Sequence, residues 1–184
     1  MKPLFAPYDR LTAAIARTAV DLLPLLARLI FAGVLAGYFW ASALTKFDGP
    51  LTPSVGAYAQ IFPRALEAAG YNPGALGLWH GLVVLAGSYA EFVLPALLIL
   101  GALTRLAALG MIGFILVQSL TDILGHGADA TTIGAWFDRI PDAQIMDQRA
   151  LWMVPLLVLV TLGAGRLSVD AMALRLRKNL PVSA

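Results

Sequence analysis

No cysteine occurs among the 184 residues of the chain, and only 13% of the residues are charged. Without thiols the chain can form neither disulfide bonds nor thiolate-ligated metal and iron–sulfur sites. A soluble domain averages about 25% charged and about 45–50% apolar residues. Here the apolar share reaches 59%, and the mean hydropathy is +0.78. The composition therefore indicates a membrane protein, and the net charge of +2 is too small to indicate a nucleic-acid partner.

Motifs that would identify a bound cofactor are also missing. The sequence has no P-loop, no G-x-G-x-x-G after a predicted strand and no H-E-x-x-H. Its two histidines, His80 and His126, fall at predicted helix ends, whereas a b-type haem would need them inside the bundle. A metal site of His80, His126 and Asp122 has suitable ligand types but no motif spacing. We therefore expect neither a haem nor a metal ion.

Four apolar stretches are long enough to cross a bilayer, which takes about 20 residues. They predict an all-α integral membrane protein, a single four-helix bundle, with spans at 22–45, 76–100, 104–124 and 149–165. Asp21 is the expected N-cap of the first span, and Pro24 follows in its first turn, where a missing N–H costs little. Residues 8–20 are expected to form a separate short amphipathic helix before it.

The distribution of basic residues predicts the orientation of the bundle, because cytoplasmic segments carry an excess of Lys and Arg. Eight basic residues lie on the side of the two termini and of the short turn at 101–103. Four lie on the side of the two long loops, 46–75 and 125–148. We therefore expect both termini in the cytoplasm and both long loops on the outer side.

Two charged residues fall well inside the predicted spans, where a charge costs about 2.5–3.5 kcal/mol. Counted from the helix ends, Arg28 lies about 9 Å and Glu91 about 13 Å from the cytoplasmic side. An arginine side chain covers this difference, so we expect a buried ion pair between them. The pair would either hold the first two helices together or serve a function, with Glu91 titrating or Arg28 binding a polar headgroup.

A row of polar residues interrupts the end of the third span, in "LVQSLTDILGHG". Gln118, Asp122 and His126 are spaced i, i+4, i+8, which places them on one helical face. Asp122 lies near a helix C-terminus, where the helix dipole disfavours a negative charge, so a cationic partner is expected. The candidates at a suitable depth are His126, Lys46, His80 and Arg149. We expect the row to line a pocket that opens outward; the alternative is a solvated helix end.

Several segments together resemble the DoxX family of bacterial four-helix membrane proteins, over roughly 22–170. They read "LLARLIFAGVLAGYFWASALTKF", "YAEFVLPALLILGALTRLAALGMIGFIL", "LGHG" and "LGAGRLSVD". The polar residues at family-like positions are Arg28, Lys46, Glu91, Arg105 and His126. The resemblance implies a multi-pass protein of the bacterial inner membrane. The long outer loops depart from the family pattern.

The resemblance also implies a quinone-linked redox role beside a partner protein that supplies electrons. In this hypothesis Glu91, Arg28, Asp122 and His126 are the candidate catalytic residues. The residues expected to bind the quinone are Lys46, His80, Gln118 and Arg149. Without cysteine or a cofactor motif, the chain alone cannot carry electrons from a sulfur donor. The alternative is a non-enzymatic anchor or assembly subunit or a small transporter, and a homo-oligomer is compatible with either.

Overall fold

A computed structural model describes residues 6–178, and all structural statements below refer to this part of the chain. Four long helices dominate it, as the sequence predicted, and each is long and apolar enough to cross a membrane. Their bounds are Ala6–Leu44, Leu78–Leu100, Thr104–Gly125 and Gln144–Leu162. The protein is therefore a multi-pass membrane protein whose surroundings are the lipid bilayer.

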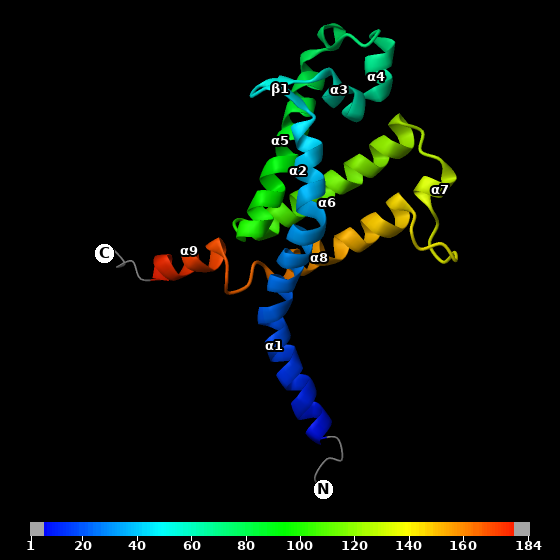
Figure 1. Cartoon of the computed structure of the whole chain (residues 1–184). Coiled ribbons are helices and arrows are strands. Elements are labelled where there is room, and N and C mark those ends of the chain that lie inside the picture. The colour runs from blue at the N-terminus through cyan, green and yellow to red at the C-terminus, as the bar shows by residue number, and fades with distance from the viewer. Residues whose placement is uncertain (1–5, 179–184) are drawn as a thin grey trace.

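The first long helix consists of three consecutive pieces, α1 (Ala6–Phe31), the π-helical turn η1 (Ala32–Ala36) and α2 (Gly37–Leu44). The prediction of a separate amphipathic helix at 8–20, before a span that begins with Asp21 as its N-cap, is wrong, because α1 runs through Asp21 and Pro24 without a break. A proline inside a helix removes one backbone donor. The helix-forming residues on either side maintain the helix despite this loss. Figure 1 shows the first turns of α1 projecting away from the bundle.

The second span is α5 (Leu78–Leu100), and the third is α6 (Thr104–Leu120) with its π-helical end η3 (Thr121–Gly125). The fourth span consists of the π-helical turn η4 (Gln144–Gln148) and α8 (Arg149–Leu162). Helix α2 packs on α5, α6 packs on α8, and α1 also packs on α8. In Figure 1 the pair α6 and α8 diverges from the pair α2 and α5 toward the end that carries the long loops, called here the loop end.

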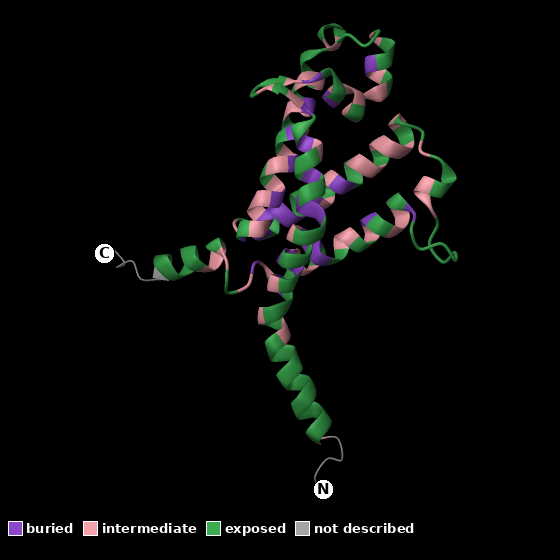
Figure 2. Cartoon of the chain, viewed as in Figure 1, coloured by how far each residue is buried: buried purple, intermediate pink, exposed green. Residues whose placement is uncertain are grey.

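The end of the bundle opposite the loop end holds the turn between α5 and α6 and is called here the terminal end. The core lies near it, where the helices converge (Figure 2). Its largest apolar members come from all four long helices. They are Phe31, Phe39, Leu98, Met111, Ile115, Leu156 and Leu159. Phe39 makes edge-on contacts with Phe114 and Trp152. Most other apolar side chains are exposed on the outer helix faces, as a lipid-facing surface requires.

The long loop after α2 folds into short elements at the loop end. A two-stranded ribbon, β1 (Phe47–Gly49) and β2 (Thr52–Pro53), is followed by α3 (Val55–Ile61) and α4 (Pro63–Ala68). Further turns in the loops are η2 (Pro73–Ala75) and α7 (Ala130–Ile133). Helix α3 packs against α5, which places it beside the loop end of the bundle.

At the terminal end, α9 (Val169–Lys178) places the Asp170 carboxylate at the start of α6. The Asp170 carboxylate accepts hydrogen bonds from the Leu103 and Thr104 backbone N–H groups, at 2.8 and 3.0 Å, and from the Thr104 hydroxyl at 2.8 Å. Burial alone would raise the pKa of Asp170, but these hydrogen bonds and the Arg28 charge outweigh it and lower the pKa below the ordinary value. Asp170 therefore caps α6 from a different helix.

Asp170→Ala is expected to destabilise the protein by about 1 kcal/mol at pH 7, the usual cost of losing an N-cap. Because the folded-state pKa is lowered, the wild-type advantage is complete above the ordinary aspartate pKa and is lost as the pH falls through the folded value. Thermal unfolding in detergent from pH 7 down to pH 3 measures this difference. Asp48→Ala, at an exposed aspartate in β1, is the control. An Asp170→Ala deficit that stays constant down to pH 3 would contradict the capping role.

Candidate functional site

A cavity of about 580 Å³ lies between the diverging helix pairs at the loop end. Its volume is within the range of about 300–1,000 Å³ that is usual for small-molecule sites. Helices α2, α5 and α6 form the walls, and α3 and η4 contribute residues at the loop end. The polar residues that line it are Tyr38, Ser42, Lys46, Gln60, Glu91, Gln118, Thr121, Asp122, His126, Gln144 and Arg149.

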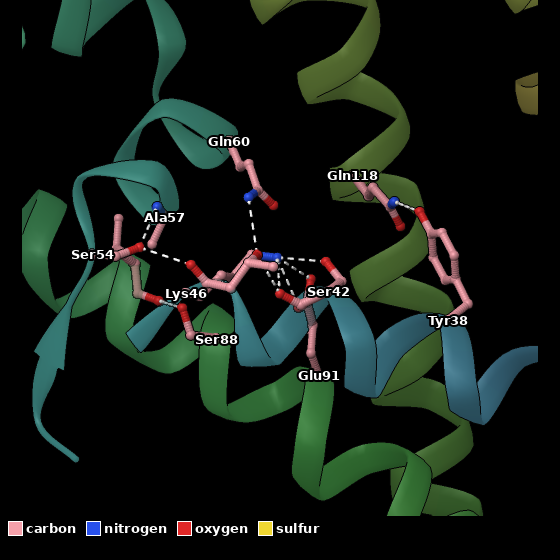
Figure 3. Close-up of polar contacts among 11 residues, drawn as sticks. Tyr38, Ser42, Lys46, Ser54, Ala57, Gln60, Ser88, Glu91 and Gln118 are labelled. Atoms are coloured by element: carbon pink, nitrogen blue, oxygen red, sulfur yellow. Dashed lines mark hydrogen bonds and ion pairs between the residues drawn. The ribbon is translucent and has the colours of Figure 1, made fainter. Parts of the chain in front are cut away.

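One wall of the cavity carries a buried ion pair between Lys46 and Glu91 (Figure 3). Lys46 follows the end of α2, and Glu91 comes from the middle of α5. The Lys46 ammonium lies 3.0 and 2.8 Å from the two Glu91 carboxylate oxygens and donates to the Ser42 hydroxyl at 2.7 Å. Both side chains are almost fully buried, at 3% and 5% exposure. Each buried charge thus has a partner, and the pair is neutral overall.

A second ion pair joins the end of α6 to the start of α8, and both of its residues line the cavity. The Arg149 guanidinium donates to the Asp122 carboxylate at 2.5 Å and to the Ser119 hydroxyl at 3.0 Å. Asp122 lies in η3 and Arg149 directly follows η4, so both come from helix ends where a π-helical turn is present. Such turns occur frequently at functional sites. Of the four cationic partners considered for Asp122, the structure selects Arg149.

The predicted row faces the cavity: Gln118, Asp122 and His126 all line it, which confirms the geometric part of the prediction. The Gln118 amide donates to the Tyr38 hydroxyl at 2.8 Å (Figure 3). His126 is exposed at the loop end, and its Nε2 lies 3.1 Å from the Gln60 carbonyl oxygen of α3. The row therefore extends along one wall from the interior to the loop end.

Two buried polar atoms in the lining have no hydrogen-bond partner within residues 6–178: the Arg149 Nε–H and the Gln118 side-chain carbonyl oxygen. A buried donor or acceptor without a partner costs about 1–3 kcal/mol. Both residues line the cavity. Protein covers both atoms, so a group that accepts one hydrogen bond and donates another would satisfy them once the two side chains turn toward the cavity.

The predicted Arg28–Glu91 ion pair is wrong. The Arg28 guanidinium instead donates to four backbone carbonyl groups, those of Leu98, Ile99, Ala164 and Leu167, at distances of 2.5–3.2 Å. Arg28 lies level with Leu98, near the end of α5. Its depth in the bundle is therefore about one helical turn less than the depth expected from counting residues from residue 22. Arg28 thus ties the α5–α6 turn to the segment after α8 and does not line the cavity.

Gly101 in this turn explains why the guanidinium fits there. Its φ of +68° is left-handed, and a Cβ at this position would lie 2.6 Å from the Ser168 Cβ and 2.9 Å from the Arg28 Cζ. A glycine is therefore required both for the backbone conformation and for the close contact. The glycine-containing "LGAGRLSVD" segment that the sequence singled out supplies the other half of this junction.

His80, expected to bind the quinone, does not line the cavity. Its ring packs edge-on against Phe62, with the centroids 4.8 Å apart. Sequence reasoning missed Ser119, which binds Arg149, and five polar residues of the lining, Tyr38, Ser42, Gln60, Thr121 and Gln144. Ser42 precedes Lys46 by four residues and Ser119 precedes Asp122 by three, and this helical spacing was the signal available for those two.

Comparison with known proteins agrees with the fold. The sequence matches the family model described as DoxX over residues 23–127. A protein of Haemophilus influenzae, described as an uncharacterized protein, is 32% identical over 149 residues, which cover 78% of this chain and 81% of that protein. No solved structure matches the chain. The family match includes Lys46, Glu91 and the polar row of α6 but ends before Arg149.

Proposed function

Since the chain belongs to the DoxX family of membrane proteins, we propose that it is a quinone-linked redox subunit that binds a quinone headgroup in the cavity. The proposal includes a bacterial inner-membrane location with both termini in the cytoplasm and a partner protein that delivers electrons. The observation that carries it is the pair of unsatisfied buried atoms in the cavity lining. Once their side chains turn toward the bound headgroup, Arg149 Nε–H can donate to a quinone carbonyl oxygen, and the Gln118 carbonyl oxygen can accept from a quinol hydroxyl.

The charge of the cavity also fits a quinone. Lys46 and Arg149 are each paired with a carboxylate, Glu91 and Asp122 respectively, so the four charges cancel. A neutral headgroup avoids adding an unpaired charge to a buried site, whereas an anionic or cationic ligand would have to break one of the pairs.

The polar row offers a proton path for the reaction. Reduction of a quinone to a quinol consumes two electrons and two protons. In the proposal the electrons come from the partner protein, since the chain has no cysteine to ligate an iron–sulfur cluster. Asp122 and His126 lie on the wall that leads to the exposed loop end, where they can pass protons between bulk water and the quinone oxygens.

Filling the cavity from its α6 wall is expected to weaken binding at least tenfold. Gly113 lines the cavity, and a Cβ added there would meet no atom within 4 Å, so Gly113→Leu places a side chain in the space proposed for the headgroup. Gly33→Leu is the matched control, because Gly33 is equally open but lies outside the cavity. The measurement is isothermal titration calorimetry in lipid nanodiscs with a tail-less dimethoxy-methyl-benzoquinone.

The two variants separate the functional alternatives. If the wild-type protein and the Gly33→Leu variant bind the quinone and Gly113→Leu does not, the cavity is the quinone site. If the wild-type protein does not bind the tail-less quinone, the quinone proposal fails, and a non-enzymatic anchor, assembly subunit or transporter becomes the better reading of the same cavity.

A further inference from the structure

A second hollow adjoins the cavity, an apolar groove of about 390 Å³ between α4 and the end of α6. Helix α4 contributes Pro63, Arg64 and Ala65, after Ile61 and Phe62. The α6 side is formed by Val117, Leu120, Thr121, Leu124 and Gly125. Apart from Arg64 and Thr121, all of these residues are apolar, whereas the lining of the cavity combines polar and apolar residues.

The groove and the cavity adjoin each other. The side chains of Ile61, Val117 and Thr121 line both of them and lie at the boundary between the two. The two helices meet closely at one point, because a Cβ on Gly125 would lie 2.9 Å from the Pro63 Cγ. Leu120 and Leu124 are exposed, at 55% and 62%, on the outward face of α6, where a membrane helix meets lipid. The groove therefore lies between the cavity and the lipid-facing surface, with the three shared side chains at its inner end.

We propose that this groove is a lateral portal that holds the isoprenoid tail of the quinone while its headgroup occupies the cavity. This inference rests on the proposed function. A membrane quinone carries an apolar tail that must stay in contact with apolar surface, and the polar loop end of the cavity offers none. The groove provides an apolar path from the headgroup site to the hydrocarbon.

The charge of the adjoining cavity favours a quinone over a phospholipid as the occupant. A phospholipid would bring a phosphate to the inner end of its acyl chain. The cations at that place, Lys46 and Arg149, are already bound to Glu91 and Asp122. A phosphate in the cavity would therefore meet two carboxylates without a free cation there, because Arg64 lines the groove but not the cavity. A quinone headgroup, in contrast, is neutral.

Ala65→Trp tests the portal by filling the groove from α4. Two probes are titrated in nanodiscs: the tail-less benzoquinone and the same headgroup with a decyl tail. We expect affinity for the tailed probe to fall at least tenfold, because the indole blocks the path of the tail. Affinity for the tail-less probe should change less than twofold. Ala68→Trp is the matched control, since Ala68 is exposed on α4 outside the groove, and it should bind both probes as the wild-type protein does.

Each result decides a separate question. If Ala65→Trp changes the affinity for the tailed probe by the same factor as the affinity for the tail-less probe, both measured against the wild-type protein, the portal is overturned. Loss of both probes in Ala65→Trp and in a second groove variant, Leu120→Trp, would also overturn it, since the effect would not depend on the tail. A diacyl phospholipid that native mass spectrometry finds on the wild-type protein but not on Ala65→Trp would assign the groove to that lipid instead. Failure of the wild-type protein to bind the tail-less probe would reject the proposed function itself.

Discussion

Lys46→Met is expected to destabilise the protein by about 2–3 kcal/mol, measured as thermal or denaturant unfolding in detergent. The substitution leaves the Glu91 carboxylate buried without its cation, since the carboxylate oxygens lie 2.8 and 3.0 Å from the Lys46 ammonium. Breaking a buried pair costs about 3–5 kcal/mol in soluble proteins. The expected value is lower here because the unfolded state in a membrane or detergent finds other polar partners.

A double variant separates the cost of the orphaned charge from the value of the pair. Lys46→Met/Glu91→Gln removes both charges and is expected to regain most of the lost stability, because a neutral amide can hydrogen-bond to Ser42 without a counter-ion. The coupling between the two positions should be at least 1 kcal/mol. Additive losses in the two single variants and the double variant would show that the two groups act independently, contrary to the geometry.

The four spans and the orientation of the polar row were predictable because both depend on local sequence. Each span is a continuous apolar run, and the spacing of Gln118, Asp122 and His126 follows directly from the helical repeat. The cost of an unpaired carboxylate at a helix C-terminus also correctly required a cation for Asp122. Such arguments need no knowledge of how one helix is placed against another.

The pairing of charges was not predictable, because it depends on the relative heights of neighbouring helices. Arg28 and Glu91 were matched by counting residues from the predicted ends of the spans. In the structure α1 extends back to Ala6, so residue 22 does not mark the level at which the helix enters the bundle. A shift of about one turn, roughly 5.4 Å, is enough to bring Arg28 to backbone carbonyls and to leave Glu91 opposite Lys46.

The polar row predicted a pocket, but the size of the cavity and its other walls had no signal in the sequence. The cavity exists because α6 and α8 diverge from α2 and α5 toward the loop end, and because Gly113 leaves open space on the α6 wall. The position of this glycine was visible, but glycine in a membrane helix more often permits close packing than creates a hollow. The π-helical turns at η3 and η4, which carry Asp122 and precede Arg149, have no recognisable sequence pattern either.

Arg149→Lys is expected to weaken quinone binding by roughly 10- to 150-fold, the equivalent of a hydrogen bond to a charged group worth about 1.5–3 kcal/mol. A lysine keeps the positive charge beside Asp122 but has no counterpart of the Nε–H, the buried donor that no group in residues 6–178 accepts from. The titration with the tail-less benzoquinone measures the change. Unfolding in detergent should show a smaller effect, because an ion pair with Asp122 can persist.

Ser119→Ala provides the control for this prediction. The Ser119 hydroxyl accepts from a terminal nitrogen of Arg149 at 3.0 Å, on the guanidinium group but away from Nε. Removing it loosens Arg149 without deleting the proposed ligand donor, so quinone affinity should fall less than threefold. If Ser119→Ala weakens binding as much as Arg149→Lys does, Arg149 acts by its position alone. If Arg149→Lys leaves affinity unchanged, Nε does not contact the headgroup, and the unsatisfied donor no longer supports a quinone site.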